Sequence, residues 1–275
     1  MPTELRPLTL GELLDRTFFL YRKNFLLFAG ITALPHLVLL AFQLAGIGIQ
    51  QWRTSAGAGV NLLWIFATLI LTLGVTAASQ GATVIAVSHV HLDRPTSITE
   101  SFAGIKGRIL YLALIMIGYG IGIGVGFVLL IVPGIILGLM WALTIPVAVL
   151  EETGLRDSVN RSAQLTKGSR GRVFVVYLLF FALIYAVIMV WEMPILFAVG
   201  MNARSHPGVG IPLWAQISIQ VGTFISQCLA GPLMTIGLSL LYYDQRVRKE
   251  GFDLQHMMAT LDATPLDGTA PAVGV

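Results

Sequence analysis

Charged side chains are scarce in this chain. Only 11% of its 275 residues are Asp, Glu, Lys or Arg, whereas 56% are hydrophobic, and the mean hydropathy is +0.81. A soluble domain usually has about 25% charged residues. Because so few charged side chains cannot cover the apolar surface of the chain in water, this composition excludes an ordinary soluble protein. The sequence predicts an integral membrane protein.

Cysteine is almost absent, and a cleavable secretion signal is missing. The single cysteine, Cys228, excludes an internal disulfide. The first 25 residues, MPTELRPLTLGELLDRTFFLYRKNF, are polar and partly acidic, without the basic start and short apolar core of a signal peptide. We therefore expect this segment to stay on the mature chain.

Catalytic motifs are also missing. The sequence contains no Gly-x-Ser-x-Gly, no His-Glu-x-x-His and no Walker loop. His89 and His91 are two residues apart, so on a helix they would not share a face and would make a poor pair of metal ligands. Glu151 and Glu152, beside Arg156, are more typical of a surface pair than of an acid and base. We expect no catalytic residue, no metal and no cofactor, and therefore no enzyme.

Six apolar stretches are long enough to cross a bilayer, which takes about 20 residues in a helix. The fourth begins at Pro133-Gly134, so the third and fourth form a tight hairpin whose turn carries no charge. The predicted fold is all-α, a polytopic membrane protein with six transmembrane helices arranged as three hairpins. The predicted spans cover residues 26–49, 60–88, 109–132, 134–150, 173–199 and 211–243.

The basic residues predict the orientation of these spans. All lysines and arginines except Arg53 and Arg204 lie in the N-terminal flank, the second and fourth connections and the C-terminal flank. Positively charged flanks are retained in the cytoplasm. We therefore expect a multi-pass protein of the cell membrane with both termini in the cytoplasm.

A short amphipathic helix is predicted on the cytoplasmic side before each hairpin. Capping boxes at Thr9-x-x-Glu12 and Ser97-x-x-Glu100 begin the first two, and Thr153 is the expected N-cap of the third. The chain then consists of three parallel repeat-like units in one membrane domain, 1–249, followed by a tail without structure, 250–275. The units are 8–90, 95–150 and 153–243.

Five glycines alternate with apolar residues in IGYGIGIGVGF, residues 117–127. No register fits the Gly-x-Gly-x-x-Gly pattern of a dinucleotide site. In a helix Gly118, Gly122 and Gly126 form a ridge that lets a neighbouring helix approach closely. The sequence indicates helix packing, and a hinge or a lipid contact stays open as the alternative.

Polar side chains recur inside the predicted spans. Gln216, Gln220, Thr223 and Gln227 fall on one face of the sixth span, where they either bond neighbouring helices or line a polar passage. His36 and Gln80 are candidates for the same network. Glu192, near the outer end of the fifth span, is an ionisable candidate that Arg53 or Arg204 can pair with.

A dense basic segment follows the third amphipathic helix. Arg161, Lys167, Arg170 and Arg172 lie within twelve residues at the expected membrane surface. Each positive charge there gains about 1 kcal/mol from anionic lipid. These residues either fix the topology only or bind lipid headgroups or a protein partner. The expected partners are membrane lipids, anionic ones included, and a protein at the cytoplasmic face; nucleic acid is not expected.

Three stretches of the chain carry a family resemblance. They are LTLGELLDRTFFLYRKNF, PVAVLEETGLRDSVNRSAQLTKGSRGRVF and LYYDQRVRKEGFDL, spread from Leu8 to Leu254. Together they resemble the family of glycerophosphoryl diester phosphodiesterase membrane domains, a family of bacterial multi-span proteins, which implies the inner membrane of a bacterium. In some relatives this region precedes a soluble hydrolase barrel, for which we expect no counterpart here, so the resemblance implies no phosphodiesterase activity. The expected function is a non-enzymatic, lipid-interacting or scaffolding membrane protein, and the alternative is a small transporter or permease component that uses the polar face of the sixth span.

Overall fold

The computed structural model describes residues 7–205 and 211–251, and these residues form helices and connecting turns without any strand. This confirms the predicted all-helical class. The helices are α1 (Leu10–Lys23), α2 (Phe25–Gly48), α3 (Gln50–Ser55), α4 (Ala58–His91), α5 (Ile98–Ala103), α6 (Ile109–Leu129), α7 (Ile131–Met140), α8 (Thr144–Leu150), α9 (Leu155–Thr166), α10 (Arg170–Ser205) and α11 (Leu213–Glu250).

Six helical segments of the described chain are long and apolar enough to cross a membrane. They are Phe25–Gly48, Ala58–His91, Ile109–Leu129, Ile131–Leu150, Arg170–Asn202 and Leu213–Glu250. Each coincides with a predicted span. The fourth is divided into α7 and α8 by a turn at residues 141–143.

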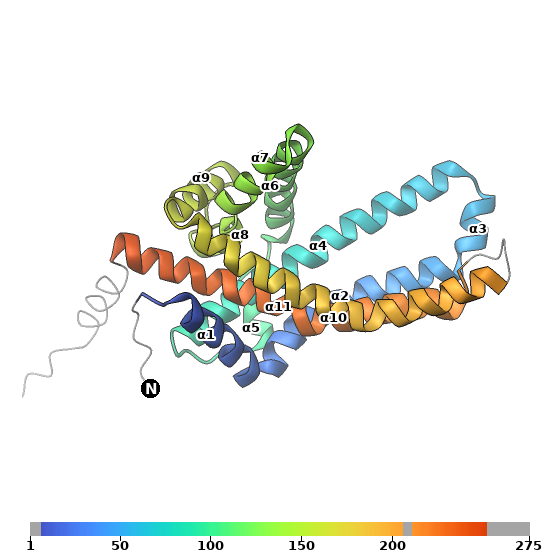
Figure 1. Cartoon of the computed structure of the whole chain (residues 1–275), viewed down its shortest axis with the longest axis horizontal. Helices are drawn as coiled ribbons and strands as arrows, with labels where there is room; N and C mark the ends of the chain where they lie inside the picture. Colours follow the sequence, from blue (N-terminus) through green and yellow to red (C-terminus); the bar gives the residue numbers. More distant parts are fainter. Residues whose placement is uncertain (1–6, 206–210, 252–275) are drawn as a thin grey trace, which may run out of the picture.

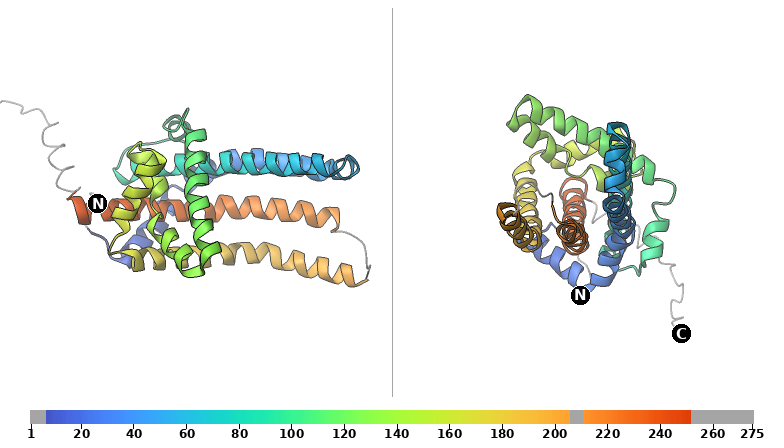
Figure 2. Two further views of the ribbon diagram at one scale, coloured as in Figure 1. Left: turned by 90° about the horizontal axis from the view of Figure 1, so that it is seen from above. Right: turned by 90° about the vertical axis from the view of Figure 1, so that its right-hand side faces the viewer.

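The long helices lie side by side along the long axis of the molecule, as Figure 1 and Figure 2 show for α2, α4, α10 and α11. Contacts join α2 to α4 and α11 to both α2 and α10. The α6–α7 pair differs, because it runs across this direction in all three views. Four of the six apolar segments therefore form a common bundle, and the other two pack on it crosswise.

α11 is the central helix of the bundle. In the most apolar 18-residue stretch of α11, 61% of the residues are buried inside the protein, against 6% in the corresponding stretch of α4. Large apolar side chains of the other long helices are exposed, for example Leu63 on α4 (71%). Such surfaces need lipid around them, because a contiguous apolar surface of this size is not stable in water.

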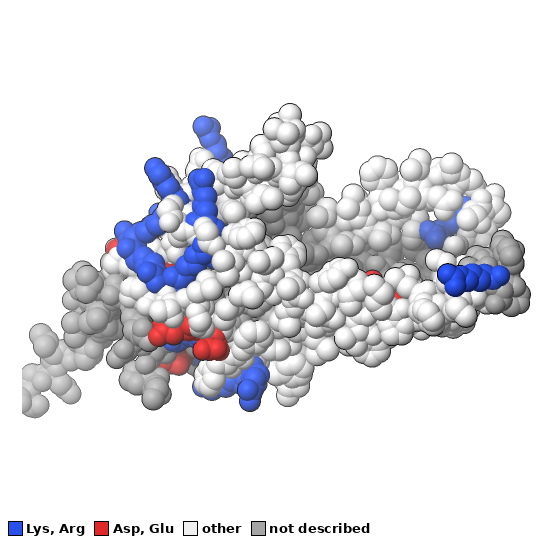
Figure 3. All heavy atoms as spheres, in the orientation of Figure 1, with Lys and Arg blue, Asp and Glu red and all other residues white. Residues whose placement is uncertain are grey.

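The short helices α1, α5 and α9 gather with charged residues at one end of the bundle, which we call the basic end (Figures 1 and 3). The predicted capping boxes are present: Thr9 N donates to Glu12 Oε2 over 2.7 Å, and Ser97 N donates to Glu100 Oε2 over 2.7 Å. The N-cap of α9 is Gly154 and not Thr153, so that prediction is wrong. The Thr153 hydroxyl lies 2.9 Å from the Ser158 hydroxyl instead. The internal repeat stays a prediction.

Candidate functional site

A polar cavity of about 380 Å³ lies between α2, α4 and α11. Threonine, serine, glutamine and histidine side chains line most of it. Four of the residues predicted to form an intramembrane network converge here from the three helices; they are His36, Gln80, Gln220 and Gln227. The cavity is therefore polar, although it is surrounded by the apolar part of the bundle.

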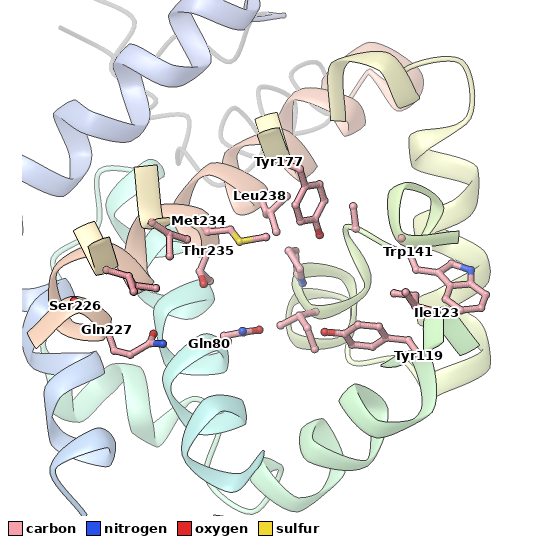
Figure 4. A pocket seen from close by; sticks show the side chains of 17 residues that line it. Gln80, Tyr119, Ile123, Trp141, Tyr177, Ser226, Gln227, Met234, Thr235 and Leu238 are labelled. Atoms are coloured by element: carbon pink, nitrogen blue, oxygen red, sulfur yellow. The ribbon is translucent and has the colours of Figure 1, made fainter. Parts of the chain in front are cut away.

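A second cavity of about 240 Å³ adjoins the first. Its far side carries Tyr119 and Trp141, and its near side carries Gln80 and Gln227 (Figure 4). Gln80, Gln227, Gly231 and Thr235 line both cavities. One end of the combined space is thus rich in amides and hydroxyls, and the other is aromatic and apolar.

Two interior prolines lie beside this space. Pro35 is inside α2 next to His36, and Pro232 is inside α11 and lines the first cavity. A proline inside a helix removes one backbone N–H donor and loosens the turn before it. His36 Nδ1 lies 2.8 Å from the carbonyl oxygen of Thr32 and 3.3 Å from Ser79 Oγ, which fixes the ring between α2 and α4.

The cavity amides do not bond the helices together. Within the described residues, the side chains of Gln80, Gln220 and Gln227 make no hydrogen bond to another part of the protein. Interhelical bonding would join these amides to one another or to a backbone carbonyl. Instead they are accessible and partly exposed, so they present free donors and acceptors to whatever occupies the cavity.

Gln216 and Glu192 lie elsewhere. Gln216 Nε2 donates to the carbonyl oxygen of Ile211 over 2.8 Å at the start of α11, and it does not line either cavity. Glu192 is half-buried on α10 and forms no ion pair with Arg53 or Arg204 in the described part of the chain. The guanidinium group of Arg53 instead lies 4.7 Å from the ring centroid of Trp64. The polar face of α11 therefore divides between the cavity and the far end of the helix.

Two of the four basic candidates take part in internal ion pairs. Arg161 Nε lies 3.1 Å from Glu151 Oε2, and its Nη2 lies 2.5 Å from Glu250 Oε1. Arg172 Nη1 lies 3.2 Å from Asp244 Oδ2. Burial lowers the pKa of Arg161, but the two carboxylates outweigh it and raise that pKa above its usual value.

The other two basic candidates stay available at the surface. Lys167 is exposed and Arg170 is half-exposed. No ion pair with a described carboxylate involves either side chain. Any headgroup contact of this segment therefore falls mainly on Lys167 and Arg170.

Sequence reasoning missed Asp244, whose side chain is fully buried. Its Oδ1 accepts a hydrogen bond from Leu8 N over 2.7 Å, and its Oδ2 lies 3.0 Å from Arg248 Nε. Arg172 Nη2 and Arg248 Nη2 also donate to the carbonyl oxygen of Leu8, over 2.7 and 2.5 Å. A carboxylate at the end of an apolar stretch, four residues before an arginine, was the available signal. We call Leu8, Arg172, Asp244 and Arg248 the Asp244 cluster.

The three stretches that carry the family resemblance meet at the basic end. The first supplies Leu8, the second supplies Glu151, Arg161 and Arg172, and the third supplies Asp244 and Glu250. Tyr242, also from the third, donates from its hydroxyl to Glu151 Oε1 over 2.9 Å. Residues from all three stretches thus take part in ion pairs and hydrogen bonds that join distant helices.

The three ridge glycines lie against close neighbours. A Cβ atom at Gly126 would lie 3.0 Å from the Cα atom of Gly134 on α7, and one at Gly122 would lie 2.5 Å from the Trp141 ring. A Cβ atom at Gly118 would meet Leu155 of α9. A larger residue at Gly126 requires α6 and α7 to move apart, whereas one at Gly118 or Gly122 requires the Leu155 or Trp141 side chain to move.

Metal-binding geometry is absent from the described residues, where no group of three or more His, Cys, Asp or Glu side chains comes together. The His91 ring packs against Tyr243, with 5.0 Å between ring centroids. The described part of the chain therefore offers polar binding sites and ion pairs, without a metal-ligand set.

Comparison with known proteins identifies a family. The family model for the membrane domain of glycerophosphoryl diester phosphodiesterase matches residues 111–261, which is more than half of the chain. No curated protein and no solved structure matches the chain. The match confirms the resemblance seen in the sequence, and the chain belongs to this family of membrane domains.

Proposed function

We propose that this membrane protein is a non-catalytic lipid-binding module that holds the polar part of an amphipathic molecule in the cavity between α2, α4 and α11. The observation that carries the proposal is the set of amides from α4 and α11, Gln80, Gln220 and Gln227, that face the cavity without an internal hydrogen-bond partner. Unpartnered polar groups in an apolar surrounding are costly, so a bound polar group stabilises them.

The cavity lining favours an uncharged polar group. Apart from His36, no ionisable side chain among the described residues lines the first cavity. A phosphate or carboxylate there would stay without a counter-charge at membrane depth, where an unpaired charge costs several kcal/mol, at least about 2.5. Amides and hydroxyls instead match hydroxyl or carbonyl groups, such as those of a glycerol backbone with its acyl esters.

The adjoining cavity accommodates the apolar part of such a molecule. Tyr119, Trp141 and Tyr177 line it together with isoleucines. The two cavities meet at Gln80 and Gln227, so a single amphipathic ligand can place its polar group among the amides and its chain among the aromatic rings (Figure 4). This division is typical of ligand sites, which combine apolar walls with a few placed polar groups.

The proposed setting is the inner membrane of a bacterium, with the basic end in the cytoplasm. The distribution of lysine and arginine supports this orientation, because only Arg53 and Arg204 lie toward the opposite end. In this orientation Lys167 and Arg170 face the headgroups of the cytoplasmic leaflet, where they attract anionic lipid or a protein partner.

Transport is the second candidate, and the continuity of the two cavities at Gln80 and Gln227 favours it. A passage needs polar lining that reaches both membrane surfaces. Gln216 continues the polar face of α11 but bonds to Ile211 outside the cavity lining, so binding explains the geometry with fewer assumptions than flux does.

Native mass spectrometry of the purified protein tests the proposal. Released from detergent, the wild-type protein is expected to retain a neutral amphipathic lipid. Combined, Gln80→Leu and Gln227→Leu are expected to lower the retained fraction of lipid at least about tenfold. Each substitution removes a hydrogen bond to the lipid of about 1 kcal/mol, and a tenfold change in affinity takes about 1.4 kcal/mol. Gln216→Leu is the matched control, because it changes the same residue type on α11 outside the cavity.

The outcomes separate the alternatives. Equal retention by Gln227→Leu and Gln216→Leu would contradict a site at the cavity, and retention of only anionic lipid would contradict the uncharged polar group. Solute movement into sealed vesicles that Gln227→Leu abolishes would favour transport instead.

A further inference from the structure

α7 is too short to cross a bilayer. Its ten residues span about 15 Å at 1.5 Å per residue, roughly half of the hydrocarbon thickness of about 30 Å. The 20-residue apolar segment is interrupted at residues 141–143. A turn at residues 141–143 separates α8 from α7, and residues 144–149 of α8 are all buried within the protein.

The end of α7 is fastened to α9. Ser162 Oγ donates to the carbonyl oxygen of Met140 over 2.8 Å, and Thr166 Oγ1 donates to the same oxygen over 3.1 Å. The backbone N–H of Leu143 donates to Ser162 Oγ over 3.0 Å. Ser162 and Thr166 are fully buried, so the last turn of α7 lies at the level of α9.

α9 belongs to the basic end. Arg161 of α9 pairs with Glu250, and Lys249 Nζ donates to the carbonyl oxygens of Gln164 and Lys167 over 2.8 and 2.7 Å. These contacts hold α9 against the last turn of α11. The tip of the α6–α7 hairpin, residues 128–132, therefore lies no more than about 15 Å from the level of the basic end.

α6 must then lie at a slant. Its 21 residues would reach about 32 Å if the helix stood upright, twice the distance over which α7 returns. Both helices share one tip, so α6 runs crosswise, as Figures 1 and 2 show. The tip is apolar and exposed, with Val128 at 87% and Ile131 at 69%.

We propose that the α6–α7 hairpin is re-entrant: it enters and leaves the membrane at the basic end, and its tip contacts the acyl chains of that leaflet alone. Four helices then cross the bilayer, α2, α4, α10 and α11, and both termini stay on the same side. The hairpin tip is a lipid-contacting surface confined to one leaflet. This inference is independent of the ligand in the cavity.

Leaflet-specific fluorescence quenching tests the inference. In a Cys228→Ser background, single cysteines at Leu130→Cys, Leu63→Cys and Leu178→Cys carry a fluorophore in vesicles with nitroxide lipid in one leaflet. Leu178 lies on α10, eight residues after Arg170 and so on the side of the basic end. Leu63 lies near the start of α4, on the side away from the basic end. Both side chains are exposed. Labelling of a Lys167→Cys variant by a membrane-impermeant reagent fixes the orientation of the protein in the same vesicles.

We expect the fluorophore at residue 130 to behave as that at residue 178, with several-fold stronger quenching from the leaflet at the basic end. The fluorophore at residue 63 is expected to show the opposite preference. Quenching at residue 130 from the far leaflet that equals or exceeds quenching from the near leaflet would overturn the proposal. Because residue 130 is 68% exposed at the tip, its substitution leaves the packing of the hairpin intact.

Discussion

The basic end and the membrane cavity use polar side chains in opposite ways. At the basic end, the fully buried carboxylate of Asp244 has four partners, which are Leu8, Arg172, Arg248 and Gln245. In the cavity, Gln80, Gln220 and Gln227 face open space and bond to no described residue. Polar groups that hold a fold are paired in the folded chain, whereas groups kept for a ligand stay unpaired until it binds. The difference separates a structural network from a candidate site.

Removal of the Asp244 charge should have the largest effect. Asp244→Asn keeps an acceptor for Leu8 but leaves the guanidinium groups of Arg172 and Arg248 without their shared carboxylate. Removing one partner of a buried ion pair costs about 3 kcal/mol or more. The free energy of unfolding, measured by SDS titration in mixed micelles, should fall by about this amount. An unchanged unfolding midpoint would mean that the Asp244 cluster does not hold the basic end together.

Loss of the Ser162 hydroxyl should have an intermediate effect. Ser162→Ala leaves the backbone N–H of Leu143 without an acceptor. It also removes one of the two hydrogen bonds that the carbonyl oxygen of Met140 accepts from α9. An unsatisfied buried backbone group costs about 1–3 kcal/mol. Hydrogen exchange of α7 and α8 should increase, while that of α2 stays as in the wild type. Uniform change across all helices would instead indicate a global loss of stability.

The exposed ion pair should contribute little. Arg108 Nη1 lies 2.9 Å from Glu152 Oε1, but the Glu152 side chain is 76% exposed. Exposed pairs contribute about 0–1 kcal/mol. Glu152→Gln is thus the charge-matched control for Asp244→Asn. Its free energy of unfolding should fall by no more than about 1 kcal/mol. A loss as large as that of Asp244→Asn would remove the distinction between buried and exposed pairs.

The cavity amide should affect stability least. Gln227→Leu removes no described hydrogen bond, so the free energy of unfolding without ligand should change by less than about 0.5 kcal/mol. Its effect should appear in ligand retention instead. A loss of about 1 kcal/mol or more in ligand-free protein would show that Gln227 bonds the helices, and the comparison above would fail.

Local and compositional features were predictable from the sequence. The capping boxes at Thr9 and Ser97 depend on residues three positions apart, and the six apolar segments depend on composition over about 20 residues. Polar residues inside apolar helices also marked His36, Gln80 and Gln227 as candidates. These inferences need no knowledge of how the helices pack.

Features that depend on packing were not predictable. Asp244 bonds to Leu8, 236 positions away, and nothing local to YYDQR identifies that partner. The break of the fourth apolar segment at residues 141–143 follows from the hydroxyls of α9, which hold the end of α7. Likewise, the sequence left open whether the glutamines of α11 bond helices or line a cavity, because both require the same spacing.

The Asp244 cluster also constrains how the protein is made. Leu8 leaves the ribosome before its carboxylate partner, which lies 236 positions later on the last described helix. Until α11 has been inserted, the charge of Arg172 has no Asp244 to neutralise it, and Leu8 lacks its bonds to Asp244 and Arg248. Leu8 and Arg172 are therefore synthesised before the carboxylate that holds them, so the Asp244 cluster forms only after α11 has been made.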